Sequence, residues 1–135
     1  MTEVWKQVEG FTGYEVSNHG GFRSLDRTIV TKAGVKRKIK GFAIKPQINK
    51  RTGYLFVMPS IPGGTGKMQF TKDLHVIVAT TFLGARPKAH DVNHKDGNKL
   101  NNSVANLEYL TREQNIQHAI DNRLFLISKK HKVAV

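Results

Sequence analysis

The chain of 135 residues contains no cysteine. This absence excludes disulfide bonds, thiol nucleophiles and cysteine-based zinc sites. Any metal ion would have to be held by oxygen atoms and imidazole nitrogens, the donors that remain. Acidic residues are also scarce, with 10 against 22 lysines and arginines, a formal net charge of +12. Such an excess indicates a polyanionic partner, either nucleic acid or an anionic membrane.

Long apolar runs are missing as well. No segment of the sequence approaches the ~20 apolar residues that a membrane-spanning helix needs, and no basic amphipathic anchor stands out. The first residues, MTEVWKQVEG, lack the charged start and apolar middle of a signal peptide. We therefore expect no membrane partner and a protein that acts in the cytoplasm, its own or that of a host cell.

The front of the chain is typical of short strands and turns. Asparagine and glycine residues between Val16 and Phe22 predict a hairpin. The run GYLFVMPSI predicts a strand because it is rich in aromatic and β-branched residues. The segment PGGTGK that follows is not a phosphate loop, since Met68 stands where that motif needs Ser or Thr. We expect a hairpin loop there, with Lys67 close to a phosphate.

Two helices are predicted further along. Apolar residues recur at helical spacing in KDLHVIVATTFLG, with Asp73 or Thr71 as the N-cap and Gly84 as the stop. The β-branched content of this segment leaves a strand as the alternative. Thr111 and Gln114 predict a capping box that begins the second helix. Between the helices, DVNHKDGN indicates a strand entering a tight turn, and NNSVANLEYLT indicates a loop and a second strand.

The segment DVNHKDGNKLNNSVANLEYLTREQN carries one histidine and six asparagines. It is either a polar loop or a metal site built from neutral ligands around one base. A strand, turn, strand and helix would bring His94 and Asn115 together. Phosphodiester hydrolysis needs a base and a cation in fixed geometry. A neutral histidine supplies the base, and asparagine carbonyl oxygens are hard ligands suited to Mg²⁺.

These residues resemble those of a known family. VNHKDGNKLNNSVANLEYLTREQN is similar to the HNH homing endonucleases of phages and their introns, and LHVIVATTFLGARP to the helix that precedes their motif. The opening WKQVEGFTGYEVSNHGGFRSLDR resembles the nuclease-associated modular motif of the same enzymes. The resemblance implies an α+β fold with a small β-rich DNA-binding region at 1–60, a ββα-metal (HNH) nuclease core at 61–125, and a basic tail at 126–135.

The resemblance also implies roles for single residues. His94 matches the general base that activates water, and Asn106 matches the asparagine that braces the hairpin and orients this histidine. Asn93 and Asn115 match the ligands of a divalent metal, Mg²⁺ or Mn²⁺. Relatives often carry Asp at the position of Asn93. The neutral side chain here predicts weaker metal affinity.

Other polar residues of the motif receive lesser roles. Asn98, Asn101 and Asn102 are expected to shape the turn. His118 lies one helical turn beyond Asn115 on the same face and is expected to contact DNA or the metal shell. Outside the motif, we expect His75 to be a packed or DNA-facing helix residue.

Basic residues are concentrated ahead of the motif, where Asp26 is the only acid between Gly20 and Arg51. A basic strand or loop could follow a DNA groove, with lysines on phosphates and Arg23 or Arg37 on base edges. Neutralising about six phosphates would give a log-log salt slope of roughly −5. The residues assigned to DNA binding are Arg23, Arg27, Lys36, Arg37, Lys38, Lys40, Lys67 and His118.

The sequence thus favours a Mg²⁺-dependent endonuclease acting on double-stranded DNA, phage-like in origin, which nicks as a monomer or cuts both strands as a homodimer. The chain ends about twenty residues after the motif. We therefore expect no helix-turn-helix module of the kind relatives often carry, and looser specificity or reliance on dimerisation or a partner. One alternative is a DNA-binding regulator with weak or lost catalysis. Another is an RNA-binding or RNA-cleaving protein, which fits the charge but lacks a recognisable RNA module.

Overall fold

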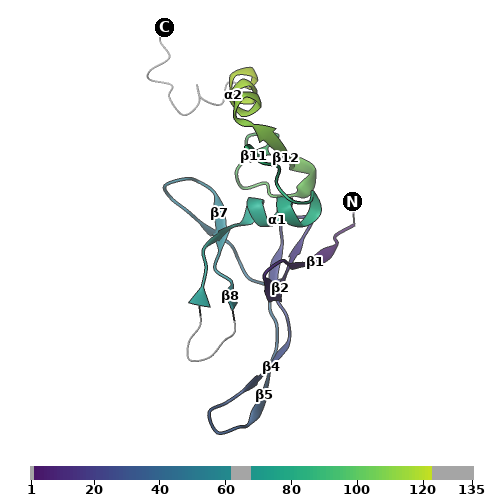
Figure 1. Cartoon of the computed structure of the whole chain (residues 1–135), viewed down its shortest axis with the longest axis vertical. Coiled ribbons are helices and arrows are strands. Elements are labelled where there is room, and N and C mark those ends of the chain that lie inside the picture. The colour runs from purple at the N-terminus through teal and green to yellow at the C-terminus, as the bar shows by residue number, and fades with distance from the viewer. Residues whose placement is uncertain (1, 62–67, 123–135) are drawn as a thin grey trace.

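The computed structural model describes residues 2–61 and 68–122, and its elements follow the expected α+β order (Figure 1). Lys67 and the basic tail lie outside the described residues. In chain order the elements are β1 (Trp5–Val8), β2 (Phe11–Ser17), β3 (Phe22–Ser24), β4 (Arg27–Val30), β5 (Lys36–Ile39), β6 (Gln47–Ile48), β7 (Leu55–Val57), β8 (Ser60–Ile61), β9 (Met68–Gln69), β10 (Lys72–Asp73), α1 (Leu74–Phe82), β11 (His90–His94), the 3₁₀ turn η1 (Val104–Asn106), β12 (Leu107–Thr111) and α2 (Arg112–Asp121).

The hairpin expected between Val16 and Phe22 joins β2 to β3. These two residues are direct cross-strand partners, and β1 pairs with the other edge of β2 to complete an antiparallel three-stranded sheet. Gly20 turns the chain at a φ of +90°, which glycine adopts without steric cost. A Cβ at Gly20 would lie 3.1 Å from the backbone oxygen of Asn102. This turn therefore packs directly against the later asparagine-rich segment.

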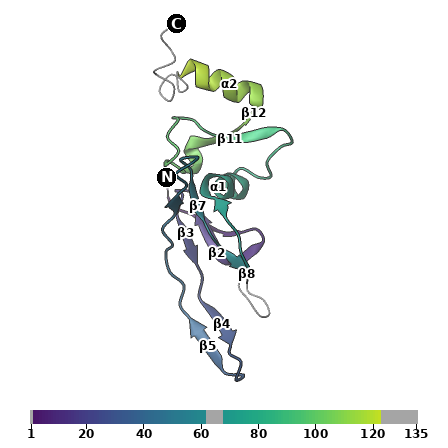
Figure 2. The ribbon, with the colours of Figure 1, turned by 90° about the vertical axis from the view of Figure 1, so that its left-hand side faces the viewer.

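Strands β4 and β5 form a separate two-stranded hairpin that extends as a narrow finger from the rest of the protein (Figures 1 and 2). Most of its side chains are exposed, including Val30 and Val35 near its turn. It contributes no residue to the buried core. A hairpin with no buried face depends on its base or on a partner for order. The finger lies at the opposite end of the molecule from α2 (Figures 1 and 2).

The first predicted helix is α1, so the strand alternative for this segment is wrong. Asp73 is its N-cap residue by position, although its side chain makes no capping hydrogen bond. Gly84 follows the helix at a φ of +91°, a conformation typical of the residue after a helix end. Nearly all of one helix face is buried, including Leu74, Ile77 and Val78. This burial against strands overrides the β-branched residues' local preference.

The second predicted helix, α2, begins at the expected capping box. The Thr111 side chain accepts a hydrogen bond from the Gln114 backbone N–H at 3.2 Å, and the Gln114 side chain accepts one from the Thr111 N–H at 2.9 Å. Strand β12 runs straight into this cap after pairing with β11 over five residue pairs. Together β11, β12 and α2 form a ββα unit.

One hydrophobic core joins the front of the chain to this unit. Val16 and Phe22 from the three-stranded sheet pack in the same buried cluster as Val78 of α1 and Leu107 of β12. Helix α1 lies between the two parts and contacts β1, β2, β11 and β12. The ββα unit is therefore held by a rigid scaffold rather than appended to it. Within residues 2–61 and 68–122, no helix has the length and apolar character needed to cross a membrane.

Candidate active site

Asn93 and His94 end strand β11, and both side chains are buried although they are polar. The register of the hairpin places Asn93 opposite Glu108 and His94 opposite Leu107. His94 has only 5% of its surface exposed. Burial of a polar group is costly unless the group is hydrogen-bonded. The partners of these two side chains therefore define the site.

The turn that follows His94 is held by Asp96 and Asn106. The Asp96 carboxylate accepts hydrogen bonds from the Asn98 backbone N–H at 2.7 Å and from the amides of Asn101 and Asn106 at 3.0 and 2.9 Å. In return, Asn106 Oδ1 accepts from the Asp96 backbone N–H at 3.1 Å. These bonds, that from Asn101 first, keep the pKa of Asp96 below its usual value. Asn106 thus braces the hairpin by fixing its turn.

The side chain that orients His94 is Asn102, which corrects the expectation for Asn106. His94 Nε2 lies 2.7 Å from Asn102 Oδ1, and among the described residues no hydrogen bond joins Asn106 to His94. The reason is geometric, because Asn106 ends η1 with its amide directed at Asp96. An amide oxygen only accepts, so Nε2 carries the proton and Nδ1 of the neutral ring keeps the lone pair. The basic atom of the site is therefore His94 Nδ1.

Two aromatic side chains pack against the His94 ring. Tyr54 and His75 stack with ring centroids 4.4 Å apart, and they lie 5.9 and 5.1 Å from the centroid of His94. Burial, with smaller contributions from His94 and Arg86, lowers the pKa of His75 to about 4. His75 is thus a neutral, packed residue at pH 7, which is one of the two roles expected for it. Tyr54 was not expected here, since its chain segment lies far from the motif.

Asn93 has a partner that the sequence reading missed. Its Nδ2 donates to Glu108 Oε2 at 3.1 Å, which fixes the orientation of the amide and leaves Oδ1 as the atom available to a cation. Asn115, on α2, lines the same cavity of about 160 Å³ as Asn93 and His94. Assigning the strand register in advance would have paired Asn93 with Glu108.

The donor set fits a divalent cation. The described residues contain no cluster of three or more histidine, cysteine, aspartate or glutamate side chains suited to a metal. The cavity offers two amide side chains, those of Asn93 and Asn115, and neutral hard oxygens of this kind suit Mg²⁺. They bring no formal charge to the cation. Lys99 also lines the cavity, and its side chain carries a positive charge.

His118 is engaged within the protein. Its Nε2 donates to the backbone carbonyl of Lys95 at 2.9 Å, which fastens α2 to the turn that follows His94. The expected contact of His118 with DNA or the metal shell stays a prediction, and within the protein the partner of His118 is the Lys95 carbonyl. The physical reason is that α2 packs across the end of β11, so its second turn meets the hairpin backbone.

Arg23 is also committed to an internal contact. Its Nε and terminal nitrogen donate to Glu15 Oε1 at 2.9 and 2.6 Å, and its guanidinium lies 3.9 Å from the centre of the Trp5 ring. Glu15 and Arg23 are cross-strand partners, so the ion pair follows from the register. Arg23 therefore joins β2 and β3 through its side chain, and its assignment to base edges stays a prediction.

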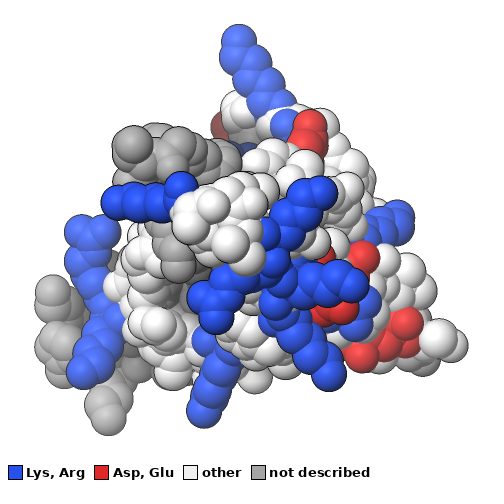
Figure 3. All heavy atoms as spheres, turned by 90° about the horizontal axis from the view of Figure 1, so that it is seen from below, with Lys and Arg blue, Asp and Glu red and all other residues white. Residues whose placement is uncertain are grey.

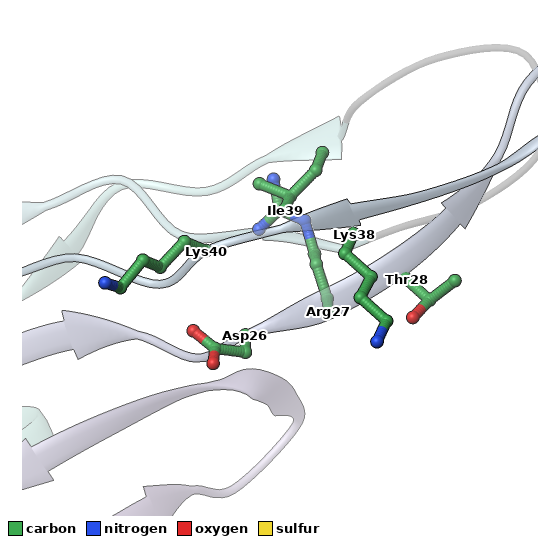
Figure 4. A pocket seen from close by; sticks show the side chains of 6 residues that line it. All are labelled: Asp26, Arg27, Thr28, Lys38, Ile39 and Lys40. Carbon is green, nitrogen blue, oxygen red and sulfur yellow. The ribbon is translucent and has the colours of Figure 1, made fainter.

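Five more basic residues of the expected DNA-binding set lie on or beside the β4–β5 finger: Arg27, Lys36, Arg37, Lys38 and Lys40. Lysine and arginine side chains spread across the face of the molecule seen from the finger's end (Figure 3). Cross-strand pairing sets Arg27 opposite Ile39 and Thr28 opposite Lys38. The two pairs point to opposite sides of the ribbon. Together with Asp26 and Lys40, these four residues line a cavity of about 540 Å³ (Figure 4).

Alternation along the finger separates its cations into two faces. Because side chains alternate and cross-strand partners share a face, one face carries Arg27, Ile29, Arg37 and Ile39. The other carries Thr28, Val30, Lys36 and Lys38. Arginine and lysine are therefore segregated.

Comparisons with known proteins agree with this geometry. Residues 72–117 match the HNH endonuclease family model, and residues 3–59 match the NUMOD4 motif. The first match contains His94 and both candidate metal ligands, and the second contains the finger.

Two of the curated relatives match nearly the whole chain, and a third matches about a third of it. It is 34% identical to an uncharacterized HNH endonuclease, L247, of Acanthamoeba polyphaga mimivirus, over 96% of this chain and 29% of the relative. It is 32% identical to the DNA endonuclease I-HmuI of Bacillus phage SP01, over 96% of this chain and 65% of the relative. A putative HNH homing endonuclease of the SPbeta prophage of Bacillus subtilis, YosQ, is 51% identical over 47 residues, which are 35% of this chain and 27% of that protein.

A solved structure extends the likeness to three dimensions. The structure described as DNA binding and cleavage by the HNH homing endonuclease I-HmuI matches with a TM-score of 0.63 at 30% identity. The match covers 97% of this chain and 66% of that one. This chain spans less than two thirds of the length of each of the curated relatives above. It carries a NUMOD4 motif followed by an HNH endonuclease domain and is homologous to the phage homing endonuclease I-HmuI.

Proposed function

We propose that this protein is a metal-dependent DNA endonuclease that hydrolyses phosphodiester bonds with His94 as the general base. The observation that carries the proposal is the bond from His94 Nε2 to Asn102 Oδ1. It directs the lone pair of Nδ1 away from Asn102, and His94 lines the same cavity as Asn93 and Asn115. An oriented base beside two oxygen ligands is the minimum that such hydrolysis needs.

In the reaction, His94 Nδ1 takes a proton from a water molecule while the water oxygen bonds to phosphorus. The opposite phosphorus–oxygen ester bond breaks, and its electron pair leaves on a sugar oxygen, which is then protonated from solvent. The aromatic wall of Tyr54 and His75 holds the His94 ring in place throughout. His94 becomes an imidazolium, and Asn102 Oδ1 still accepts from Nε2 in that state.

HNH endonucleases generally use a divalent metal ion, and we propose Mg²⁺, with Mn²⁺ as a substitute. Asn93 and Asn115 would hold it through their amide oxygens. When bound, the ion supplies positive charge to the phosphate and the leaving oxygen. Glu108 contributes by orienting Asn93. Because no ligand is charged, we infer that DNA phosphate is needed to complete the metal's shell.

We further propose double-stranded DNA as the partner, gripped by the β4–β5 finger. Arginine pairs well with the edge of guanine, and the apolar side chains between the arginines can meet thymine methyl groups. The arginine face of the finger is thus suited to a DNA groove, and the lysine face to phosphates. Neutralising about six phosphates gives an expected log-log salt slope of roughly −5. A slope near zero would exclude this surface as the main contact.

We assign DNA binding to residues 1–60 and hydrolysis to residues 61–125, and we treat residues 126–135 as a basic tail. One ββα site cuts one strand per encounter, so a monomer should nick, and a homodimer should cut both strands. The cytoplasm of the host cell is where such a protein would meet its DNA.

Supercoiled plasmid with Mg²⁺ tests this proposal. The wild type should convert it to the nicked form, and His94→Ala should reduce the rate by at least about 100-fold while binding DNA with unchanged affinity. No conversion by the wild type with any divalent metal would reject the endonuclease. Equal rates for both proteins would reject His94 as the base.

A second candidate is a DNA-binding regulator whose catalysis is weak. The specific observation in its favour is the neutral Asn93, which leaves the cavity without a carboxylate. This candidate predicts tight DNA binding without nicking even at high Mg²⁺ or Mn²⁺ concentrations. RNA offered beside DNA in the same assay tests the remaining alternative, an RNA-binding or RNA-cleaving protein.

A further inference from the structure

We propose that Lys99 is a catalytic residue that binds the scissile phosphate of DNA and holds it against His94. This inference rests on the proposed endonuclease function. Its starting point is the cavity itself, because Lys99 lines it together with His94, Asn93 and Asn115. Lys99 thus shares one cavity with the base and the candidate metal ligands.

The position of Lys99 is built by a segment that is distant in sequence. Lys99 Nζ donates to the backbone carbonyl of Thr52 at 2.8 Å and lies 4.9 Å from the centre of the Tyr54 ring. Tyr54 in turn stacks against His94. The same aromatic ring therefore contacts both the cation and the base, which fixes their relation to each other.

The turn that receives Lys99 is itself well ordered by hydrogen bonds. Asn49 accepts from the backbone N–H groups of Arg51 and Gly53, and its own N–H donates to the Tyr54 carbonyl. Gly53 adopts a φ of +80°, and a Cβ there would lie 3.3 Å from Lys99 Cδ. A lysine that simply reached into solvent would not need these contacts along its side chain. A side chain held in this way loses less entropy when it binds a ligand.

The charge of the cavity lining indicates the ligand. Among its lining residues there is no carboxylate, and Lys99 is the cation. An ammonium group has three donors, of which one contacts Thr52, so two remain for an anion. A preorganised cation beside the general base is suited to the negative charge that grows on phosphate oxygens during hydrolysis.

The test compares variants of the full chain under single-turnover conditions, with DNA saturated by enzyme and Mg²⁺ present. Lys99→Gln keeps a donor for the Thr52 carbonyl but removes the charge, and Lys99→Arg keeps the charge. Lys95→Gln is the matched control, because it removes one exposed charge from the same turn. We expect Lys99→Gln to slow cleavage of bound DNA by about 10- to 100-fold, with DNA affinity changed by less than about threefold.

Lys99→Arg should retain most of the rate, and Lys95→Gln should cleave like the wild type. Equal rates for Lys99→Gln and the wild type would overturn the inference while leaving the endonuclease intact. A loss of rate explained by a matching loss of folded protein, measured by melting, would also overturn it and make Lys99 an anchor for the 49–54 turn. Failure of the wild type to cleave would instead reject the proposed function.

Discussion

Two of the antiparallel hairpins, β11–β12 and the β4–β5 finger, differ in how far their side chains are buried. In the β11–β12 hairpin, Asn93 and His94 are buried polar residues, and Asn93 has a hydrogen-bond partner on the facing strand. In the β4–β5 finger the side chains are mostly exposed, and none belongs to the core. The function we propose for the β11–β12 hairpin is catalysis, which needs fixed atoms, and this hairpin is braced from several sides. The function we propose for the finger is contact with a long polyanion, which needs reach and positive charge.

The contrast predicts that single substitutions near His94 strongly reduce the cleavage rate. Single substitutions on the finger should change DNA affinity only weakly. The largest effect should come from Asn102. Asn102→Ala removes the acceptor that sets the tautomer of His94, so both ring nitrogens become available to the proton. We expect single-turnover cleavage to slow by up to about 100-fold with unchanged DNA affinity. Asn106→Ala is the comparison, and it should act mainly on melting temperature. Equal loss of rate in both variants at equal stability would remove the distinction between orienting and bracing.

The next effect concerns stability and pH. The pKa of His75 is lowered to about 4 in the folded protein from 6.5. As the pH falls, His75 is therefore protonated in the unfolded chain before it is protonated in the folded protein. The free energy of unfolding decreases between about pH 6.5 and 4. The expected cost by about pH 5 is about 2 kcal/mol. His75→Phe keeps a ring against Tyr54 but cannot titrate, so urea denaturation should show a flatter pH profile for the variant. Parallel profiles would exclude His75 as the source.

A smaller effect should follow from restoring a charge at the metal site. Asn93→Asp adds a carboxylate ligand but places it against Glu108, which now accepts from the Asn93 amide. The double variant Asn93→Asp with Glu108→Gln relieves that repulsion. We expect it to lower the half-saturating Mg²⁺ concentration by about tenfold, and the single variant to gain less. Titration of cleavage against Mg²⁺ measures both. No gain in either variant would argue against Asn93 as a ligand.

The smallest effect should come from the finger. Lys38→Gln should weaken DNA binding by a few-fold and reduce the salt slope by about one, whatever the sequence of the DNA. Arg37→Lys keeps the charge on the arginine face, so it should preserve the slope but relax sequence preference. Fluorescence anisotropy with several duplexes at several salt concentrations distinguishes the two. A change of slope in Arg37→Lys would contradict the separation of the faces.

Local signals in the sequence were sufficient for several of the elements. The capping box at Thr111, the turn between Val16 and Phe22 and the glycine after α1 depend on neighbouring residues only. They were therefore readable in advance. The charge imbalance likewise predicts a polyanionic partner without any fold. The spacing of histidine and asparagines, through a family resemblance, located the motif that the HNH model matches.

The contacts within the site were decided only by the tertiary structure. Nothing in a run of asparagines distinguishes Asn102, which holds His94, from Asn106, which holds Asp96. The sequence by itself determined the charge, the elements and the motif, because these follow from composition and from residues adjacent in the chain. Packing of Tyr54 against His75 of α1 decided that its ring meets both His94 and Lys99. Contacts between segments far apart in the chain depend on how all the elements pack at once.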